Sequence, residues 1–412
     1  MFRALRHRNY RLFFAGQTVS LLGMWLQAVG LSWLIYRLTG SSFAVGLVTV
    51  AQQGPGLFIG PVAGALADRH SRRAILVSVH AVLIVPSLVL GVLTLSGLVE
   101  PWHVVALALV MGICRGFEIP ARQSFIPALI DRADLPNAVA LNSALFNSAR
   151  LVGPAIAGPV IAWFGEGWLF LANAVSFVPI IGALLLMQLA PRIVRTQNGT
   201  SLFGEIREGL RYVRGEPIAW ALLGGIACAS LFGMPYSVLL PSFVDRVLQE
   251  GPATFGYMNS AIAVGAISSA LVLATRRGIE GIERWIVAAG VAFGLALVLF
   301  SRASSVELAF ALLPLVGAAF MMMMAATNTL LQLTVPDELR GRVMSLHSAL
   351  FLGVLPFGGL IAGALADRIG EPAVLAFGGV AAAISALGFG RVLLRRSREL
   401  RAIARVEGAL AD

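Results

Sequence analysis

GALADRHSRR, residues 64–73, separates two apolar stretches, GPGLFIGPVA at 54–63 and AILVSVHAVLIVPSLVLGVL at 74–93. A run of about 20 apolar residues is long enough to cross the hydrocarbon core of a bilayer as a helix. Charged side chains close to hydrocarbon are energetically unfavourable and usually have a function. The stretch therefore predicts a charged loop between two membrane-spanning helices.

The composition of the whole chain predicts many more such spans. The 412 residues are 58% hydrophobic and 13% charged, whereas a soluble domain carries roughly 25% charged residues. Windows of about 19 residues predict an all-α polytopic membrane protein with twelve transmembrane helices. We expect them near residues 12–36, 43–66, 74–96, 103–122, 140–164, 168–189, 218–243, 254–275, 284–301, 306–332, 343–366 and 372–394.

The chain divides at its longest polar stretch. We expect an N-terminal six-helix bundle at 1–190, a cytoplasmic linker at 191–217, a C-terminal six-helix bundle at 218–394 and a cytoplasmic tail at 395–412. Apolar residues of the linker recur at helical spacing, which favours an amphipathic helix on the membrane surface; a solvated linker with one or two helical turns is the alternative. The two halves resemble each other: IDRADLP before the fifth span corresponds to VPDELRGR before the eleventh.

The arginines indicate the orientation. The chain has no lysine, and all but six of its 31 basic residues fall on one side of the expected membrane. That side also holds both termini and is therefore predicted to be cytoplasmic. Because these arginines are spread over several loops and do not form one patch with interleaved aromatic residues, we expect no binding of nucleic acid. The exceptions are Arg37, Arg246, Arg302 and Arg368 in the opposite loops and Arg115 and Arg150 within spans.

The charged loop resembles the loop between the second and third helices of major facilitator superfamily transporters. The resemblance rests on Gly64, Leu66, Asp68, Arg69, Arg72 and Arg73, with Ser71 where the family usually has glycine. It implies the major facilitator fold, in which the two six-helix halves are related by a pseudo-two-fold axis along the membrane normal. It also implies a gate, in which Asp68 binds the N-terminal end of the eleventh helix and Arg72 pairs with Asp131. Gly64, Arg69 and Arg73 belong to the same gate.

Further segments resemble the enterobactin-exporter-like branch of that superfamily, the transmembrane secretion effectors, which also includes macrolide efflux proteins. These segments are FEIPARQ at 117–123, LPNA at 135–138 and LNS at 141–143. Gly153, Pro154 and Gly158 resemble the exporter motif of the fifth helix, although Pro159 stands where the motif usually has a second glycine. The resemblance implies export of a small molecule across the bacterial inner membrane.

Polar residues within the spans are the candidates for substrate binding and coupling. They are Gln27, Arg115, Glu118, Asn173, Asn328 and His347, with His80 as a further proton-carrier candidate. Arg115 and Glu118 lie three residues apart and share a helix face. They form either a structural ion pair or part of a cavity wall, in which case Glu118 is the leading proton carrier.

We therefore expect a transporter rather than an enzyme. No catalytic triad, nucleotide-binding glycine loop or metal-ligand spacing is present, and Cys114 and Cys228 both fall within spans. We expect no cofactor, with a proton gradient as the energy source, and a monomer whose partners are a small-molecule substrate, protons and the lipid bilayer. Two alternatives stay open: an importer or uniporter of the same fold, and a membrane scaffold or lipid-handling protein without ion coupling.

Overall fold

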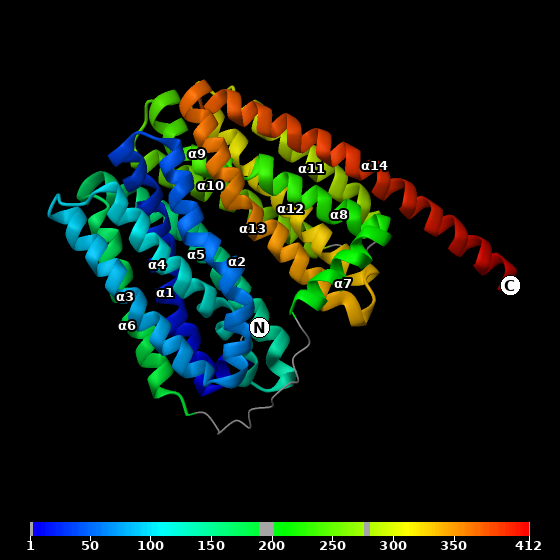
Figure 1. The fold of residues 1–412 in the computed structure, drawn as a ribbon, viewed down its shortest axis with the longest axis horizontal. Helices are drawn as coiled ribbons and strands as arrows, with labels where there is room; N and C mark the ends of the chain where they lie inside the picture. Colours follow the sequence, from blue (N-terminus) through cyan, green and yellow to red (C-terminus); the bar gives the residue numbers. More distant parts are fainter. Residues whose placement is uncertain (1–2, 189–201, 276–280, 412) are drawn as a thin grey trace. The chain divides into compact units, whose positions relative to one another are not determined.

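The computed structural model describes residues 3–188, 202–275 and 281–411, and the regular secondary structure of these residues is helical throughout (Figure 1). Twelve helical segments are long and apolar enough to cross a membrane, which confirms the predicted fold class. The first six lie in α1 (Arg8–Thr39), α2 (Ser42–Arg69), α3 (Arg72–Leu95), α4 (Pro101–Phe125), α5 (Leu135–Phe164) and α6 (Gly167–Leu186).

The second half begins with the linker helix α7 (Leu202–Gly215). The seventh span is an interrupted helix made of α8 (Pro217–Cys228), a π-helical turn at Ala229–Gly233, α9 (Tyr236–Ser242) and a second π-helical turn at Phe243–Val247. The remaining helices are α10 (Pro252–Ala274), α11 (Ile282–Phe300), α12 (Val306–Thr334), α13 (Asp337–Ile369) and α14 (Glu371–Ala411). Residues 395–411, expected as a separate tail, continue α14 as a helix (Figure 1).

Local signals explain where these helices begin and end. Gly40 follows α1 in the left-handed conformation, with a φ of 62°, which glycine adopts without strain. The Ser41 hydroxyl then accepts a hydrogen bond from the Ala44 amide at the start of α2, and the Ser71 hydroxyl caps α3 in the same way. Short capped turns of this kind connect long apolar helices in an antiparallel arrangement.

The described chain forms two compact units. The first contains Met1–Asn198 together with Leu240–Ser260, and the second contains Gly199–Leu239 with Ala261–Asp412. A short segment from the second half of the sequence thus belongs to the first unit. This segment includes the end of the seventh span and the start of the eighth.

Close helix packing builds the first unit. In it, α1 packs along α6 and α2 along α4. At Gly16 on α1, an added Cβ would lie 2.8 Å from the Ile180 Cα of α6, so only glycine permits this approach. Small residues at such crossings let helices associate in lipid, where no hydrophobic force drives them together.

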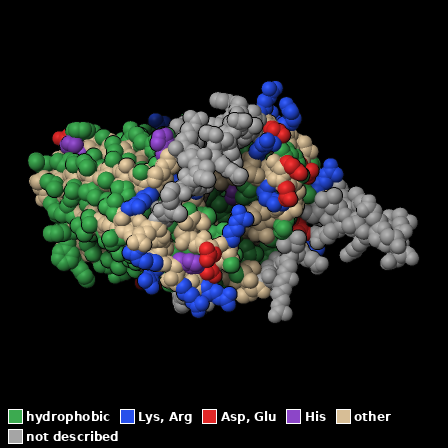
Figure 2. Space-filling model, turned by 90° about the horizontal axis from the view of Figure 1, so that it is seen from below, with side chains coloured by type: hydrophobic (Ala, Val, Ile, Leu, Met, Phe, Trp, Pro, Cys, Tyr) green, Lys and Arg blue, Asp and Glu red, His purple; other side chains and the backbone are tan. Residues whose placement is uncertain are grey.

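Hydrophobic side chains cover much of the surface. On α3, Val85 and Val92 are each 59% exposed, and they share one face of the helix. Figure 2 shows a broad area of mostly hydrophobic side chains, while arginine and acidic side chains gather elsewhere in the same view. An exposed apolar area of this extent is typical of a surface that contacts lipid.

The second unit packs α11 against both α12 and α14. In it, α7 contacts the start of α13, where Arg342 and Glu208 form an ion pair of 2.8 Å. The linker thus contains a helix, and its expected position on the membrane surface stays a prediction.

Candidate functional site

Four helices of the first unit bring polar side chains together around Gln27. The Gln27 amide oxygen on α1 accepts hydrogen bonds from the Ser87 hydroxyl on α3, at 2.9 Å, and from the Asn173 amide on α6. The Gln27 amide nitrogen donates to the Met111 sulfur on α4 at 2.7 Å. Two residues that the sequence singled out, Gln27 and Asn173, are thus directly bonded in the protein interior.

Charged side chains of α4 lie beside this cluster. Glu118 pairs with Arg122, one helical turn later, at 3.8 Å between the carboxylate oxygen and the guanidinium Nε. The two side chains are 13% and 17% exposed, respectively. Arg115 also acts electrostatically on Glu118. Among the described residues, however, Glu118 forms its ion pair with Arg122.

Arg115 and Glu118 both line the cavity described below, whereas the close ion pair of Glu118 is made with Arg122. A role of Arg115 as the partner of Glu118 stays a prediction. The fourth span was expected to end at residue 122, whereas α4 continues to Phe125, so that Arg122 lies inside the helix. The spacing of four residues between Glu118 and Arg122 was the available signal.

The polar cluster lines one small cavity together with Arg115 and Glu118, and this cavity is partly open to solvent. Four sequence-predicted candidates contribute to its wall, namely Gln27, Arg115, Glu118 and Asn173. The Gln17 amide oxygen, also at this cavity, is buried without a hydrogen-bond partner among the described residues. The cavity thus offers a small molecule amide groups, the Glu118 carboxylate and the Arg115 guanidinium.

His80 is a packing residue by its contacts. Its ring is buried, its Nδ1 lies 2.7 Å from the Leu76 carbonyl oxygen, and its edge faces the Phe177 ring at 5.7 Å between centroids. It nevertheless lies close enough to act electrostatically on Glu118.

The candidate residues in the second unit, His347 and Asn328, make fewer hydrogen bonds than the residues around Gln27. His347 on α13 is buried, and its Nε2 has no hydrogen-bond partner among the described residues. Asn328 on α12 is half-buried and accepts a hydrogen bond of 3.1 Å from Gln332 of the same helix.

The charged loop between α2 and α3 is described only in part. Gly64, Asp68 and Arg69 lie in the last turns of α2, and their surroundings fall outside the described residues. Arg72 donates a hydrogen bond to the Ser124 carbonyl at the end of α4, and Arg73 donates to the Leu185 carbonyl near the end of α6 at 2.6 Å. These contacts tie the start of α3 to two neighbouring helices.

Asp131 is exposed on the turn before α5. The neighbouring acid, Asp134, forms an ion pair of 2.9 Å with His7. The role of Asp131 as a partner of Arg72 stays a prediction.

The exporter-motif residues of α5 form a close helix crossing with α10. An added Cβ at Gly158 would lie 2.7 Å from the Pro252 carbonyl oxygen and 2.8 Å from that of Ala253. Gly256 of α10 approaches the Pro154 carbonyl in return. The Ser260 hydroxyl donates to the Leu151 carbonyl at 2.8 Å, which adds a hydrogen bond to the crossing.

Sequence reasoning missed a group of contacts at the end of α1. The Tyr36 hydroxyl donates to the Asp245 carboxylate at 2.6 Å, across a sequence separation of 209 residues. Arg246 donates to the Gly40 carbonyl, and its guanidinium lies 5.9 Å from the centre of the Tyr36 ring. A local sequence pattern does not predict contacts between residues that are so far apart in the chain.

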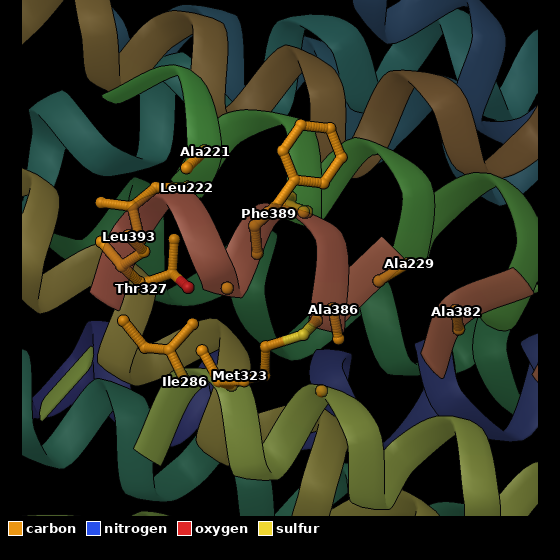
Figure 3. Close-up of a pocket in the computed structure, with 15 residues that line it drawn as sticks. Ala221, Leu222, Ala229, Ile286, Met323, Thr327, Ala382, Ala386, Phe389 and Leu393 are labelled. Atoms are coloured by element: carbon orange, nitrogen blue, oxygen red, sulfur yellow. The ribbon is translucent and has the colours of Figure 1, made fainter. Parts of the chain in front are cut away.

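A second cavity lies in the second unit among α8, α11, α12 and α14. Figure 3 shows Phe389, Leu393 and Met323 around it. Apart from the Thr327 hydroxyl, its lining side chains are apolar. It resembles a packing gap between helices, so the polar cavity of the first unit is the better candidate.

Comparisons with known proteins show the family of the chain. Residues 1–409 match the family model described as transmembrane secretion effector. The chain is 26% identical to the staphyloferrin A transporter of Staphylococcus aureus, over 87% of this chain and 90% of that protein. It is 29% identical to the multidrug efflux pump Tap of Mycolicibacterium fortuitum, over 92% and 93%.

A solved structure shows the same fold. The crystal structure of the nucleoside transporter NupG superposes with a TM-score of 0.71, covering 95% of this chain and 99% of that chain at 15% identity.

Proposed function

This chain belongs to the transmembrane secretion effector family of the major facilitator superfamily, and we propose that it exports a small organic molecule in exchange for protons. It is a multi-pass membrane transporter and not an enzyme. The single observation that carries export is the match over nearly the whole chain to a secretion family and to a multidrug efflux pump. Alternating access between the two sides of the membrane is the mechanism that we assign to it.

The substrate is a siderophore or an amphipathic drug. This choice follows the activities of the two relatives, a staphyloferrin A transporter and a multidrug pump. The polar cavity supports it, because its wall combines amide, hydroxyl and charged side chains with apolar side chains.

Glu118 is the proton carrier in this proposal. Its carboxylate lies in the cavity wall, within a membrane span, where an ionisable group is rare and usually functional. Arg122 stabilises the ionised form, in which the proton has been released. Protonation removes the charge that holds Arg122 and changes the electrostatics of the cavity.

The charged loop forms the inner gate, with Asp68 at its centre, and the proton gradient is the only energy source, with no cofactor. The protein acts as a monomer in the bacterial inner membrane with both termini in the cytoplasm. The distribution of arginines supports this orientation.

A flux assay in inside-out membrane vesicles tests export. An antiporter accumulates the dye ethidium, a macrolide or a siderophore in such vesicles when their interior is made acidic, and a proton-conducting ionophore abolishes the accumulation. A uniporter equilibrates the probe without concentrating it, and an importer moves it in the opposite direction. A scaffold or lipid-handling protein gives no flux above vesicles that lack the chain. Any of these three results overturns the proposal.

A further inference from the structure

We propose that Tyr36, Gly40, Asp245 and Arg246 form an outer latch, which closes the exit side of the transporter and must open each time substrate is released. The inference rests on the proposed export function. The residues of the latch are not part of the transport site, and they are assigned a positioning role.

The latch joins the end of the first span to the end of the seventh. Tyr36 is nearly fully buried, and its hydroxyl donates to the Asp245 carboxylate at 2.6 Å. The next residue, Arg246, donates to the carbonyl of Gly40, the glycine that ends α1, and lies over the Tyr36 ring. Two consecutive charged residues, Asp245 and Arg246, thus both contact the C-terminal end of α1.

Further buried contacts lie close to the latch residues in the sequence. The hydroxyls of Ser42 and Ser242 lie 2.6 Å apart, and these residues are 0% and 1% exposed. The Trp33 and Phe255 rings stack with 5.6 Å between their centroids. In the proposed latch, these buried groups separate when the exit opens.

The segment that carries Asp245 is set off from the rest of its span by two changes of helical geometry. The seventh span changes to π-helical geometry at Ala229–Gly233 and again at Phe243–Val247. The boundary between the two compact units falls between these turns, after Leu239. Local π-helical turns interrupt a rigid rod and are frequent at functional positions.

The latch contacts are suited to repeated opening. Hydrogen bonds between polar groups are exchanged for bonds to water when they open, so their net contribution to an equilibrium is small. Loss of one bond to a charged acceptor nevertheless shifts the equilibrium between closed and open states by roughly tenfold.

A labelling experiment tests the latch without any substrate. Purified full-length protein carries Ser242→Cys in a background with Cys114→Ser and Cys228→Ser, and its reaction with a membrane-impermeant thiol reagent is timed. Tyr36→Phe removes only the hydroxyl, and Asp245→Asn removes only the charge. Each is expected to raise the labelling rate roughly tenfold, because the latch opens more often.

Tyr257→Phe is the matched control, because Tyr257 lies in the same segment but is 46% exposed. It should leave the labelling rate unchanged. Unchanged rates in Tyr36→Phe and Asp245→Asn as well would overturn the latch.

A disulfide tests whether opening is needed for transport. The Ser42→Cys, Ser242→Cys pair replaces hydroxyls that are 2.6 Å apart, a separation that suits the short Cβ–Cβ distance of a disulfide. Oxidation should abolish export, reductant should restore it, and each single variant should transport in both conditions. Export at the normal rate by the oxidised double variant overturns the latch. Absence of export in the unmodified protein overturns the proposed function instead, and the labelling rates still decide the latch.

Discussion

At the scale of single residues, Gln27 holds the centre of the first unit together. A glutamine amide supplies both acceptor and donor, and here it uses them toward three other helices. In a bundle surrounded by lipid, water does not replace a lost partner, so each buried polar group depends on its neighbours. The same residue lines the cavity, which makes its bonds a support for the site.

Gln27→Leu is predicted to lower the stability of the protein by about 1–3 kcal/mol, because the buried Ser87 and Asn173 groups lose a shared acceptor. The measurement is the thermal unfolding midpoint of purified protein in detergent. Gln123→Leu is the control, because Gln123 is an exposed glutamine of α4. An equal midpoint for Gln27→Leu and the unmodified protein would show that the network adds nothing to stability.

Individual site residues were predictable only where they contrast with their surroundings. Gln27 and Asn173 stand out as amides within apolar runs, and the structure bonds them to each other. Ser87 was missed because a serine within a helix usually bonds to its own backbone. The ion pair of Glu118 with Arg122 was missed because Arg122 was expected at the very end of the fourth span, and helix ends are the least certain part of a sequence-based assignment.

At the scale of elements, the crossing of α5 and α10 shows what the exporter motif does in this chain. Gly158 and Gly256 bring the two backbones into direct contact, and Ser260 adds a hydrogen bond. The sequence marked Gly153, Pro154 and Gly158 as a motif. Their partner helix was not predictable, because the spacing of the motif residues does not indicate which helix, here α10, packs against them.

Gly158→Leu is predicted to separate α5 from α10, since an added Cβ already lies 2.7 Å from the Pro252 carbonyl oxygen. Substrate export should fall by at least tenfold, and the unfolding midpoint should drop. Gly182→Leu is the matched control, because no atom lies within 4 Å of an added Cβ there. Normal export by Gly158→Leu, at normal protein abundance in the membrane, would mean that the close crossing is dispensable.

At the scale of the whole molecule, the number and order of the spans were predictable because long apolar windows fold locally into helices. The grouping of Leu240–Ser260 with the first unit was not. The sequence places this segment within the second half. The contacts that group it with the first unit, such as Tyr36 to Asp245, join residues far apart in the chain. Its Pro241 and the flanking π-helical turns do not by themselves name a partner.

The orientation of the molecule gives a direct prediction. In intact cells, with Cys114 and Cys228 replaced by serine, Leu98→Cys should react with an impermeant thiol reagent, because Leu98 is exposed in the loop between α3 and α4. Glu338→Cys, exposed at the start of α13, should react only after the cells are permeabilised. The reverse pattern would invert the topology and move the outer latch to the cytoplasmic side.

The most direct test of the central claim compares two activities of Glu118→Gln in proteoliposomes. If Glu118 carries the proton, this variant loses accumulation of substrate driven by a proton gradient but retains counterflow exchange, which needs no proton. Glu338→Gln, an exposed acid on α13, is the matched control and should perform both activities. Accumulation against a gradient by Glu118→Gln, with the pH profile of the unmodified protein, would contradict the account.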